Sequence, residues 1–245
     1  MLSSCRSTLS TSENDLAQIV VVSNDSTSSS SVSSILLPEL SQPGDTARWT
    51  IEYLKPKDLN AVQRICRDSF PLDYPESWFQ EVVAGRFIAF GVFHGEILTS
   101  LLVAEIKRIS ECDQEDRDLV RDPDTLVCYI LSLAVSSEYR RRGIASFLLD
   151  HLMKFHVNSP PFPKIVFLHV LHSNLGAINF YKKSGFQHHT TLQNYYLIGE
   201  VYEAGCTFVL NTNRSTSSGS IKEMFNFICA FLCKPFRSFF RPKIF

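Results

Sequence analysis

A basic, glycine-containing turn stands where an apolar stretch gives way to a helical pattern. Residues 129–135 have the bulky and β-branched side chains typical of a strand buried on both faces, and 144–151 repeat apolar residues at spacings of three and four. Three arginines, 140–142, and Gly143 lie between them. A helix start presents unpaired N–H groups and a positive dipole end, and glycine lets the backbone approach a phosphate closely. The pattern predicts an anion site, although an ordinary basic surface turn would have the same sequence.

A second pattern lies downstream, with one predicted strand between the two. The run Asn174 to Phe186 reads N-x-x-A-x-x-F-Y-x-x-x-G-F, and the turn reads Arg140-x-x-Gly143-x-Ala145. Together and in this order they resemble the GNAT superfamily of N-acetyltransferases over about residues 47–212. The resemblance implies an α/β fold whose mixed central sheet has two splayed central strands and flanking helices. It also implies acetyl-CoA as the co-substrate and no metal.

The resemblance further implies where the co-substrate is held. Main-chain groups of the first splayed strand would bind the pantetheine, backbone N–H groups of the turn would bind the pyrophosphate, and the second pattern would complete the site. The residues concerned are Leu133, Ala134, Val135, Arg141, Arg142, Gly143, Ile144, Ala145, Ser146, Asn174 and Tyr181.

Four shorter stretches narrow the resemblance to protein N-terminal acetyltransferases. They are FPLDYPESW at 70–78, YILSLAV at 129–135, FLHVLHSN at 167–174 and QNYYLI at 193–198. They are most similar to the Golgi-anchored NatF type and next to the catalytic subunit of the NatE type. Such enzymes would acetylate the α-amino group of proteins that begin with Met followed by Leu, Ile, Phe, Tyr or Lys. No Ser, Cys or Lys stands out as a covalent nucleophile, so we expect direct attack in a ternary complex.

Two residues could move the proton that this reaction releases. A free α-amino group has a pKa near ~8, so a base must take its proton, and an acid must return one to the leaving thiolate. The resemblance implies that Tyr129 and His169 are this pair, acting through an ordered water. An imidazole titrates near ~6.5 and a phenol near ~10, which favours His169 as the base and Tyr129 as the group that positions water or donates. Without the resemblance, His169 would be read as a buried core histidine.

Strand periodicity orients the first of these residues. Because alternate side chains share a face, Tyr129 is expected to lie with Leu131 and Leu133. Cys128 would point to the opposite face and pack in the core.

Two aromatic segments are candidates for substrate selection. The resemblance implies that they pinch the first two residues of a peptide and form an apolar slot suited to methionine. The residues concerned are Phe70, Pro71, Leu72, Asp73, Tyr74, Leu131, Tyr195 and Tyr196. If tyrosines from these segments close the peptide groove, an α-amine would be favoured over a long lysine side chain. The alternative is that the tyrosines only pack against a strand. Two other functions stay open: a lysine or histone acetyltransferase, and a membrane-bound adaptor that no longer turns over.

The elements that would position these residues follow from periodicity. Strands are expected over Trp49–Tyr53, Phe87–Phe93, Ile97–Ile106, Tyr129–Val135, Lys164–Leu171, around Tyr195–Ile198 and over Thr207–Leu210; helices are expected from Asp58 to near Phe70, over Glu76–Val83, after Gly143 and from Asn174 or Leu175 to Lys183. The charged run 111–124 is interpreted as a solvated loop. This order indicates a mixed α/β layout on one sheet.

Composition limits the classes of function. At 245 residues and 44% hydrophobic content, the chain can bury one substantial core with extensions left over. A formal net charge of −1 argues against general nucleic-acid binding. The seven cysteines are scattered, without C-x-x-C, which argues against structural zinc and a disulfide framework and favours a reducing compartment. No apolar run reaches the ~18 residues of a membrane span, and no signal peptide is evident. The protein is expected to be a monomer.

The domain, residues 46–212, is flanked by two regions of different composition. Residues 1–45 are rich in Ser and Thr and are predicted to be a disordered lead, because they cannot bury enough apolar surface to offset the entropy of ordering. Residues 213–220 are predicted to be a flexible linker.

The tail, residues 221–245, spaces apolar residues as in a helix and carries five Lys or Arg against one Glu. This pattern predicts a helix that lies on an anionic membrane surface, and palmitate on Cys229 or Cys233 could add a second anchor. By resemblance, that surface is the cytosolic face of the Golgi membrane; a helix packed on the domain is the alternative. We expect deletion of 221–245 to release the protein to the cytosol in cell fractionation, and persistent membrane association would contradict the anchor.

Overall fold

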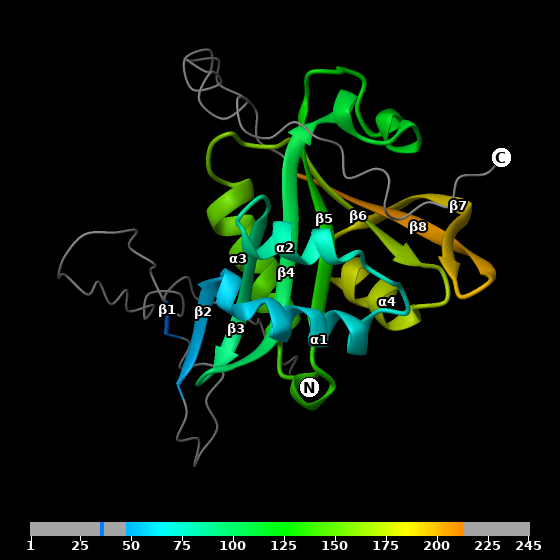
Figure 1. Cartoon of the computed structure of the whole chain (residues 1–245). Helices are drawn as coiled ribbons and strands as arrows, with labels where there is room; N and C mark the ends of the chain where they lie inside the picture. The colour runs from blue at the N-terminus through cyan, green and yellow to red at the C-terminus, as the bar shows by residue number, and fades with distance from the viewer. Residues whose placement is uncertain (1–34, 37–47, 213–245) are drawn as a thin grey trace, which may run out of the picture.

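The computed structural model describes residues 35–36 and 48–212, which form one sheet with helices on both faces (Figure 1). The strands are β1 (Ile35–Leu36), β2 (Trp49–Tyr53), β3 (Ile88–His94), β4 (Ile97–Arg108), β5 (Leu126–Val135), β6 (Ile165–Leu171), β7 (Gln187–Ile198) and β8 (Val201–Asn211). The α-helices are α1 (Leu59–Ser69), α2 (Glu76–Val83), α3 (Ile144–Leu152) and α4 (Leu175–Lys183). Short 3₁₀ turns lie at Pro56–Asp58, Ile109–Glu111, Gln114–Leu119 and Ser137–Tyr139, and a π-helical turn, Met153–Val157, continues α3.

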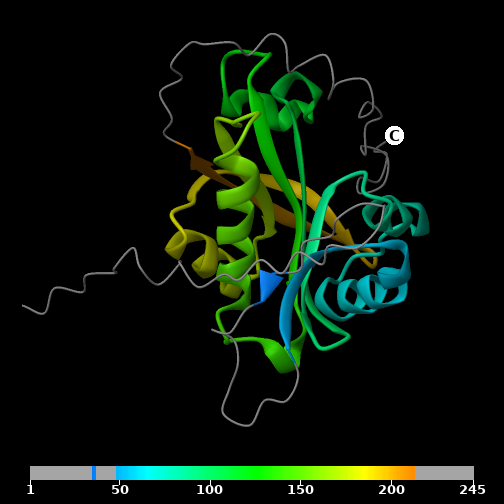
Figure 2. The ribbon, with the colours of Figure 1, turned by 90° about the vertical axis from the view of Figure 1, so that its left-hand side faces the viewer.

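The sheet is mixed. Its strands lie in the order β1-β2-β3-β4-β5-β6-β8-β7. All described neighbours pair antiparallel except β5 and β6, which are parallel. Helices α1 and α2 cover one face and α3 and α4 the other, as the two views show (Figures 1 and 2). The α/β fold expected from the sequence is therefore confirmed.

Two apolar clusters hold the helices to the sheet. On the face of α3 and α4, Leu148 and Ile178 pack in one buried cluster with Val166 of β6. On the face of α1 and α2, Trp78 and Val82 are fully buried in a second cluster. Burial of each such side chain contributes roughly 1.5–3 kcal/mol, so apolar periodicity alone is enough to fix which face of each helix meets the sheet.

The helices and the strands β2 to β6 lie close to their predicted ranges, whereas β7 and β8 are longer than predicted. They span 12 and 11 residues and form a hairpin that places β8 between β6 and β7. Most β7 side chains are exposed or half-buried. A strand at the sheet edge needs no alternation of apolar residues, so the periodicity showed only its last four residues.

The sheet gains its outermost strand from the Ser/Thr-rich lead. Ile35 pairs with Ile51 and Leu36 with Thr50 of β2. These two residues fall within the stretch that the sequence assigns to disorder. The remaining residues of 1–45, the linker 213–220 and the tail 221–245 lie outside the described residues. Within 35–36 and 48–212, no helix is both long and apolar enough to cross a membrane.

Candidate active site

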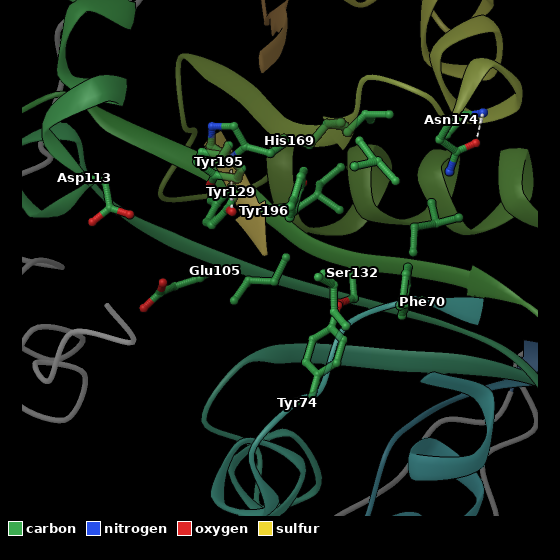
Figure 3. A pocket seen from close by; sticks show the side chains of 18 of the residues that line it. Phe70, Tyr74, Glu105, Asp113, Tyr129, Ser132, His169, Asn174, Tyr195 and Tyr196 are labelled. Carbon is green, nitrogen blue, oxygen red and sulfur yellow. Dashed lines mark hydrogen bonds between the residues drawn. The ribbon is translucent and has the colours of Figure 1, made fainter. Parts of the chain in front are cut away.

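The two parallel strands separate along their length. The β5–β6 ladder runs from Val127–Ile165 to Ile130–Leu168. Beyond it, β5 pairs only with β4 as far as Val135, and β6 only with β8 as far as Leu171. The splayed central strands expected from the sequence are therefore present, and a cavity of about 500 Å³ opens at the splay (Figure 3).

The cavity collects most of the predicted site residues. Those that line it are Tyr129, His169, Leu131, Leu133, Asn174, Tyr181, Phe70, Pro71, Leu72, Tyr74, Tyr195 and Tyr196. Asp73 is exposed and does not line it, nor do Ala134, Val135 or the turn 141–146.

A bulge in β5 changes the predicted face of one residue. Val103 of β4 pairs with Ser132, but Ala104 pairs with Ile130, so Leu131 is an extra residue. Tyr129 and Leu131 pack toward the face of α1 and α2 or its flank, whereas Leu133 packs in the cluster of α3 and α4. The prediction that Leu133 shares a face with Tyr129 was therefore wrong, because strict alternation does not survive a bulge.

Tyr129 and His169 meet on the same side of the sheet. The Tyr129 hydroxyl lies 3.2 Å from Nδ1 of His169. Phe167 stacks on Tyr129 with ring centroids 4.7 Å apart and meets His169 edge-on. Burial raises the pKa of the Tyr129 phenol well above its usual value. The hydroxyl is therefore protonated at neutral pH.

The second ring nitrogen of His169 is held by a residue that sequence reasoning missed. Nε2 lies 3.0 Å from Oδ1 of Asp116, and the two side chains are 2% and 4% exposed. A carboxylate only accepts, so Nε2 carries the proton and Nδ1 accepts from Tyr129. Tyr129, His169 and Asp116 thus form one hydrogen-bonded row, which we call the proton row.

Asp116 belongs to the run 111–124. The interpretation of that run as a solvated loop was wrong for Cys112 and Asp116, which are buried, whereas most of its other residues are exposed. Ile109 and Cys112 are buried in a cluster with Val127, Ile165 and Phe167 of the sheet. The apolar residues in and beside this charged run were the available signal that it packs on the sheet. The many charged residues instead favoured the interpretation as a loop. The excursion from Ile109 to Thr125 therefore packs on the sheet and carries Asp116 to His169.

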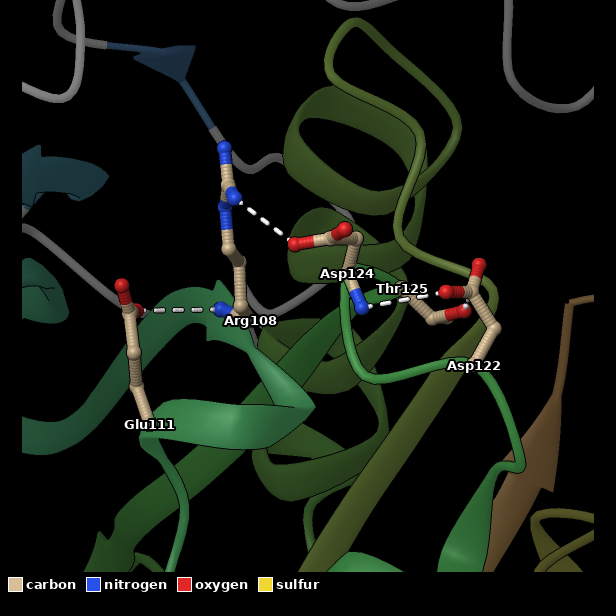
Figure 4. Close-up of polar contacts among 5 residues, drawn as sticks. All are labelled: Arg108, Glu111, Asp122, Asp124 and Thr125. Atoms are coloured by element: carbon tan, nitrogen blue, oxygen red, sulfur yellow. Dashed lines mark hydrogen bonds and ion pairs between the residues drawn. The ribbon is translucent and has the colours of Figure 1, made fainter.

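Polar contacts close the base of this excursion (Figure 4). The backbone N–H of Arg108 donates to Oε2 of Glu111 at 3.1 Å, and the Arg108 guanidinium pairs with Asp124 at 2.8 Å. Asp122 accepts from the Asp124 N–H and from the Thr125 hydroxyl, each at 3.1 Å. With both ends tied together, the excursion is fixed over the start of β5 and β6.

Tyr195 covers the open side of the proton row. Its ring stacks on His169 with centroids 4.6 Å apart, and it is hydrogen-bonded to Tyr129. The β7–β8 register shifts between Leu192 and Tyr196, with Asn194 in the left-handed region at φ 55°, which lets Tyr195 leave the regular ladder. Figure 3 shows Tyr129, His169, Tyr195 and Tyr196 gathered at one place in the cavity.

Gly205 makes room for the Tyr195 ring, which leads to a testable expectation. A Cβ at Gly205 would lie 2.7 Å from Cδ1 and 3.1 Å from Cβ of Tyr195. Because the contact involves the root of the side chain, Gly205→Ala must displace Tyr195 from His169. We expect kcat/KM for a peptide substrate to fall by about tenfold, which corresponds to a rise of ~1.4 kcal/mol in the activation free energy. Steady-state kinetics would check this, and an unchanged kcat/KM would show that the position of Tyr195 does not depend on the space at Gly205.

The loop after α1 forms the opposite wall. Phe70 and Leu72 contribute apolar surface, and the Tyr74 hydroxyl lies 3.3 Å from Oγ of Ser132 on β5. Tyr74 also packs on Trp78 with centroids 4.4 Å apart. The loop is thereby fixed to both α2 and the splayed strand, so the wall is preformed.

The predicted phosphate turn has the expected open helix start. Gly143 has φ 81° and Arg141 has φ 67°, both left-handed. An added Cβ at Gly143 would meet no protein atom within 4 Å, so the left-handed backbone conformation, and not a lack of space, favours glycine at this position. The Ile144 side chain is buried in the core, which leaves only its main chain for a ligand. Arg140 is exposed, but its Nε donates to the Val135 carbonyl at 2.9 Å.

The second sequence pattern lines the same cavity from α4. The Asn174 side chain caps this helix by accepting from the Ala177 N–H at 3.0 Å. Tyr181 is buried, and burial raises its pKa above the usual value. Cys128 is fully buried, as predicted, and burial raises the pKa of its thiol to about 12, so it cannot supply a thiolate. Among the described residues, no group of three or more His, Cys, Asp or Glu could hold a metal ion.

Comparison with known proteins identifies the family of this chain. The family model described as "Acetyltransferase (GNAT) family" matches residues 59–186. The chain is similar to N-alpha-acetyltransferase 60 of Xenopus tropicalis, with 36% identity over 184 residues that cover 72% of this chain and 75% of that protein. It is also similar to histone acetyltransferase MCC1 of Arabidopsis thaliana, with 30% identity over 190 residues that cover 73% and 76%.

Solved structures agree with the sequence comparison. The crystal structure of Arabidopsis thaliana NAA60 in complex with a bisubstrate analogue has a TM-score of 0.63 and 32% identity, covering 68% of this chain and 99% of that one. The acetyl-CoA complex of the same protein has a TM-score of 0.62 and 30% identity, with the same coverage. From the family match and these relatives, the chain belongs to the GNAT acetyltransferases, in the group of the N-alpha-acetyltransferases 60 (NatF).

Proposed function

We propose that this chain transfers the acetyl group of acetyl-CoA to the α-amine of protein N-termini that begin with Met. The proton row of Tyr129, His169 and Asp116 at the wall of the cavity is the observation that carries the proposal. Relatives named N-alpha-acetyltransferase 60 and the acetyl-CoA complex of the Arabidopsis protein support both the reaction and the co-substrate.

The residues present fit acetyl-CoA. Leu131, Ser132 and Leu133 line the cavity on the β5 edge that has no β6 partner, so main-chain groups there can bond the pantetheine. The open start of α3 behind Gly143 would hold the pyrophosphate. Asn174 and Tyr181 also line the cavity. When bound, the thioester supplies an activated acetyl group, and the remaining tasks fall to the chain.

The proton row provides a path for the proton of the attacking amine. As the C–N bond forms and the C–S bond breaks, that proton passes to the Tyr129 oxygen, and the hydroxyl proton moves to Nδ1 of His169. The resulting imidazolium is stabilised by Asp116 3.0 Å away. The reverse movement returns a proton to the thiolate. His169 was expected to meet the amine or a water directly, but both its ring nitrogens have protein partners, so we assign that contact to Tyr129.

The apolar wall supports methionine as the first substrate residue. Phe70, Leu72 and Leu131 line the cavity, and Tyr196 borders it beside the proton row. An unbranched thioether fills such an irregular apolar space without a buried polar group. The tyrosines that border the cavity leave little room for a long lysine side chain, which favours the α-amine as the nucleophile.

A peptide assay tests this proposal against the second candidate. The relative named histone acetyltransferase MCC1 is the specific reason to keep lysine acetylation open. We expect acetylation of a peptide beginning Met-Leu and little acetylation of an N-terminally blocked peptide with an internal Lys. Preference for the blocked peptide would replace the proposed function with lysine acetylation. Binding of acetyl-CoA without turnover on either peptide would favour the non-catalytic adaptor.

We also propose that the protein acts at the cytosolic face of the Golgi membrane through its tail, residues 221–245. The support is the amphipathic, basic sequence of this segment, which lies outside the described residues.

A further inference from the structure

Two charged residues of β4 lie in the cavity wall beside Tyr129 and outside the proton row. Nζ of Lys107 lies 3.0 Å from Oε2 of Glu105, and their side chains are only 18% and 20% exposed. Glu105 pairs directly with Tyr129 across the β4–β5 ladder. The Lys107 ammonium lies 5.3 Å from the centroid of the Tyr129 ring. Figure 3 shows Glu105 and Asp113 at the end of the cavity away from Asn174.

The carboxylates around this end pose a problem for the proposed reaction. Glu105, Glu111 and Asp113 line the cavity, and Asp116 lies behind His169. A nearby negative charge favours the protonated form of an amine, and an ammonium ion has no lone pair with which to attack. An uncompensated carboxylate opposite Tyr129 would therefore hold the substrate in its unreactive form.

We propose that Lys107 is a positioning residue whose ion pair with Glu105 keeps that carboxylate from holding the substrate amine as an ammonium ion. The inference rests on the proposed function and adds a residue to it. Two observations support it: the short Nζ–Oε2 distance in a mostly buried wall, and the register that sets Glu105 against Tyr129. In such a place a unit charge acts over a few ångströms with little screening.

Lys107 keeps its charge in this environment. Burial alone would lower its pKa, but Glu105 and other acidic neighbours raise it above the ordinary value. The other titratable or charged groups around the cavity are Tyr129 on β5; Glu111, Cys112, Asp113, Asp116 and Arg117 on the excursion; Tyr74 on the loop after α1; Tyr181 on α4; and His169, Tyr195 and Tyr196 on the facing strands. Arg117 also lines the cavity, and its Nε donates to the Cys112 carbonyl at 3.0 Å. Lys107 is thus the cation bonded to Glu105.

The test compares Lys107→Met, Lys107→Arg and the double variant Glu105→Gln/Lys107→Met. For each, kcat/KM for a Met-Leu peptide is measured against pH. We expect Lys107→Met to move the acid limb upward by about one pH unit, and so to lower kcat/KM at neutral pH by about tenfold. Lys107→Arg keeps the positive charge and should retain most of the wild-type profile. The double variant removes both charges and should move the limb back.

Three outcomes would overturn the inference. They are an unmoved acid limb in Lys107→Met, a double variant as displaced as Lys107→Met, and an arginine variant as impaired as the methionine variant. A purely structural role for Lys107 would lower the melting temperature without moving the limb. If the wild-type protein acetylates no α-amine, the proposed function is wrong, and this inference, which depends on it, is wrong as well. Wild-type turnover with an unchanged Lys107→Met profile removes this inference alone.

Discussion

Replacement of His169 by alanine is expected to lower kcat by about 10²–10⁴-fold, the range for loss of a positioned acid–base group. The variant removes the acceptor 3.2 Å from the Tyr129 hydroxyl, so that hydroxyl can no longer pass on the proton that it receives. It also separates Tyr129 from Asp116. The affinity for acetyl-CoA should change little, because the turn before α3 and the edge of β5 that would hold the co-substrate are left intact. Single-turnover kinetics and calorimetry with acetyl-CoA would measure the two effects separately.

His189 offers a matched control for this experiment. Its Nε2 lies 3.1 Å from Oδ2 of Asp118, so it makes the same kind of contact with the same excursion, but it does not line the cavity. His189→Ala should therefore keep kcat near that of the wild type. Equal effects of the two substitutions would mean that anchoring of the excursion explains the loss. Unaltered turnover in His169→Ala would remove His169 from the mechanism.

Much of the fold could be predicted because its signals are local. The apolar stripe of α1, the loop-bounded α2 and the strand–turn–helix around Gly143 each show their pattern within about 10–20 residues. Residues on adjacent segments, such as Phe70 and Tyr74, could likewise be placed near one another. The joint approach of Tyr129 and His169 needed the resemblance, since nothing local links two residues on separate strands.

What the sequence could not predict depends on contacts between distant segments. Asp116 lies 53 residues from its partner His169, and its neighbours are as acidic as those of any exposed loop. The bulge at Leu131 is set by the register with β4, and the room for Tyr195 is set by Gly205 on another strand. In each case the residue itself looks ordinary, and only the partner gives it a role.

Asp116→Asn tests the most unexpected member of the proton row. The exchange keeps the size of the side chain, but an amide can donate to Nε2 of His169, which would leave the ring proton on Nδ1. A protonated Nδ1 cannot accept from Tyr129, so the row is broken at its centre. A comparable exchange behind a catalytic histidine costs up to about 10⁴-fold in kcat, and we expect a loss of about 10²–10⁴-fold here. The nitrogen chemical shifts of the His169 ring would report the change of tautomer directly.

Asp118→Asn separates this effect from a general weakening of the excursion. Asp118 lies two residues further along the same turn and makes a more exposed contact with His189, so its replacement removes another anchor of the excursion without touching the proton row. Because exposed pairs contribute only about 0–1 kcal/mol, this variant should remain folded and active. If Asp116→Asn turned over as fast as Asp118→Asn, or if the His169 ring kept its proton on Nε2, the buried carboxylate would not be orienting the histidine, and the path of the proton would have to end at His169.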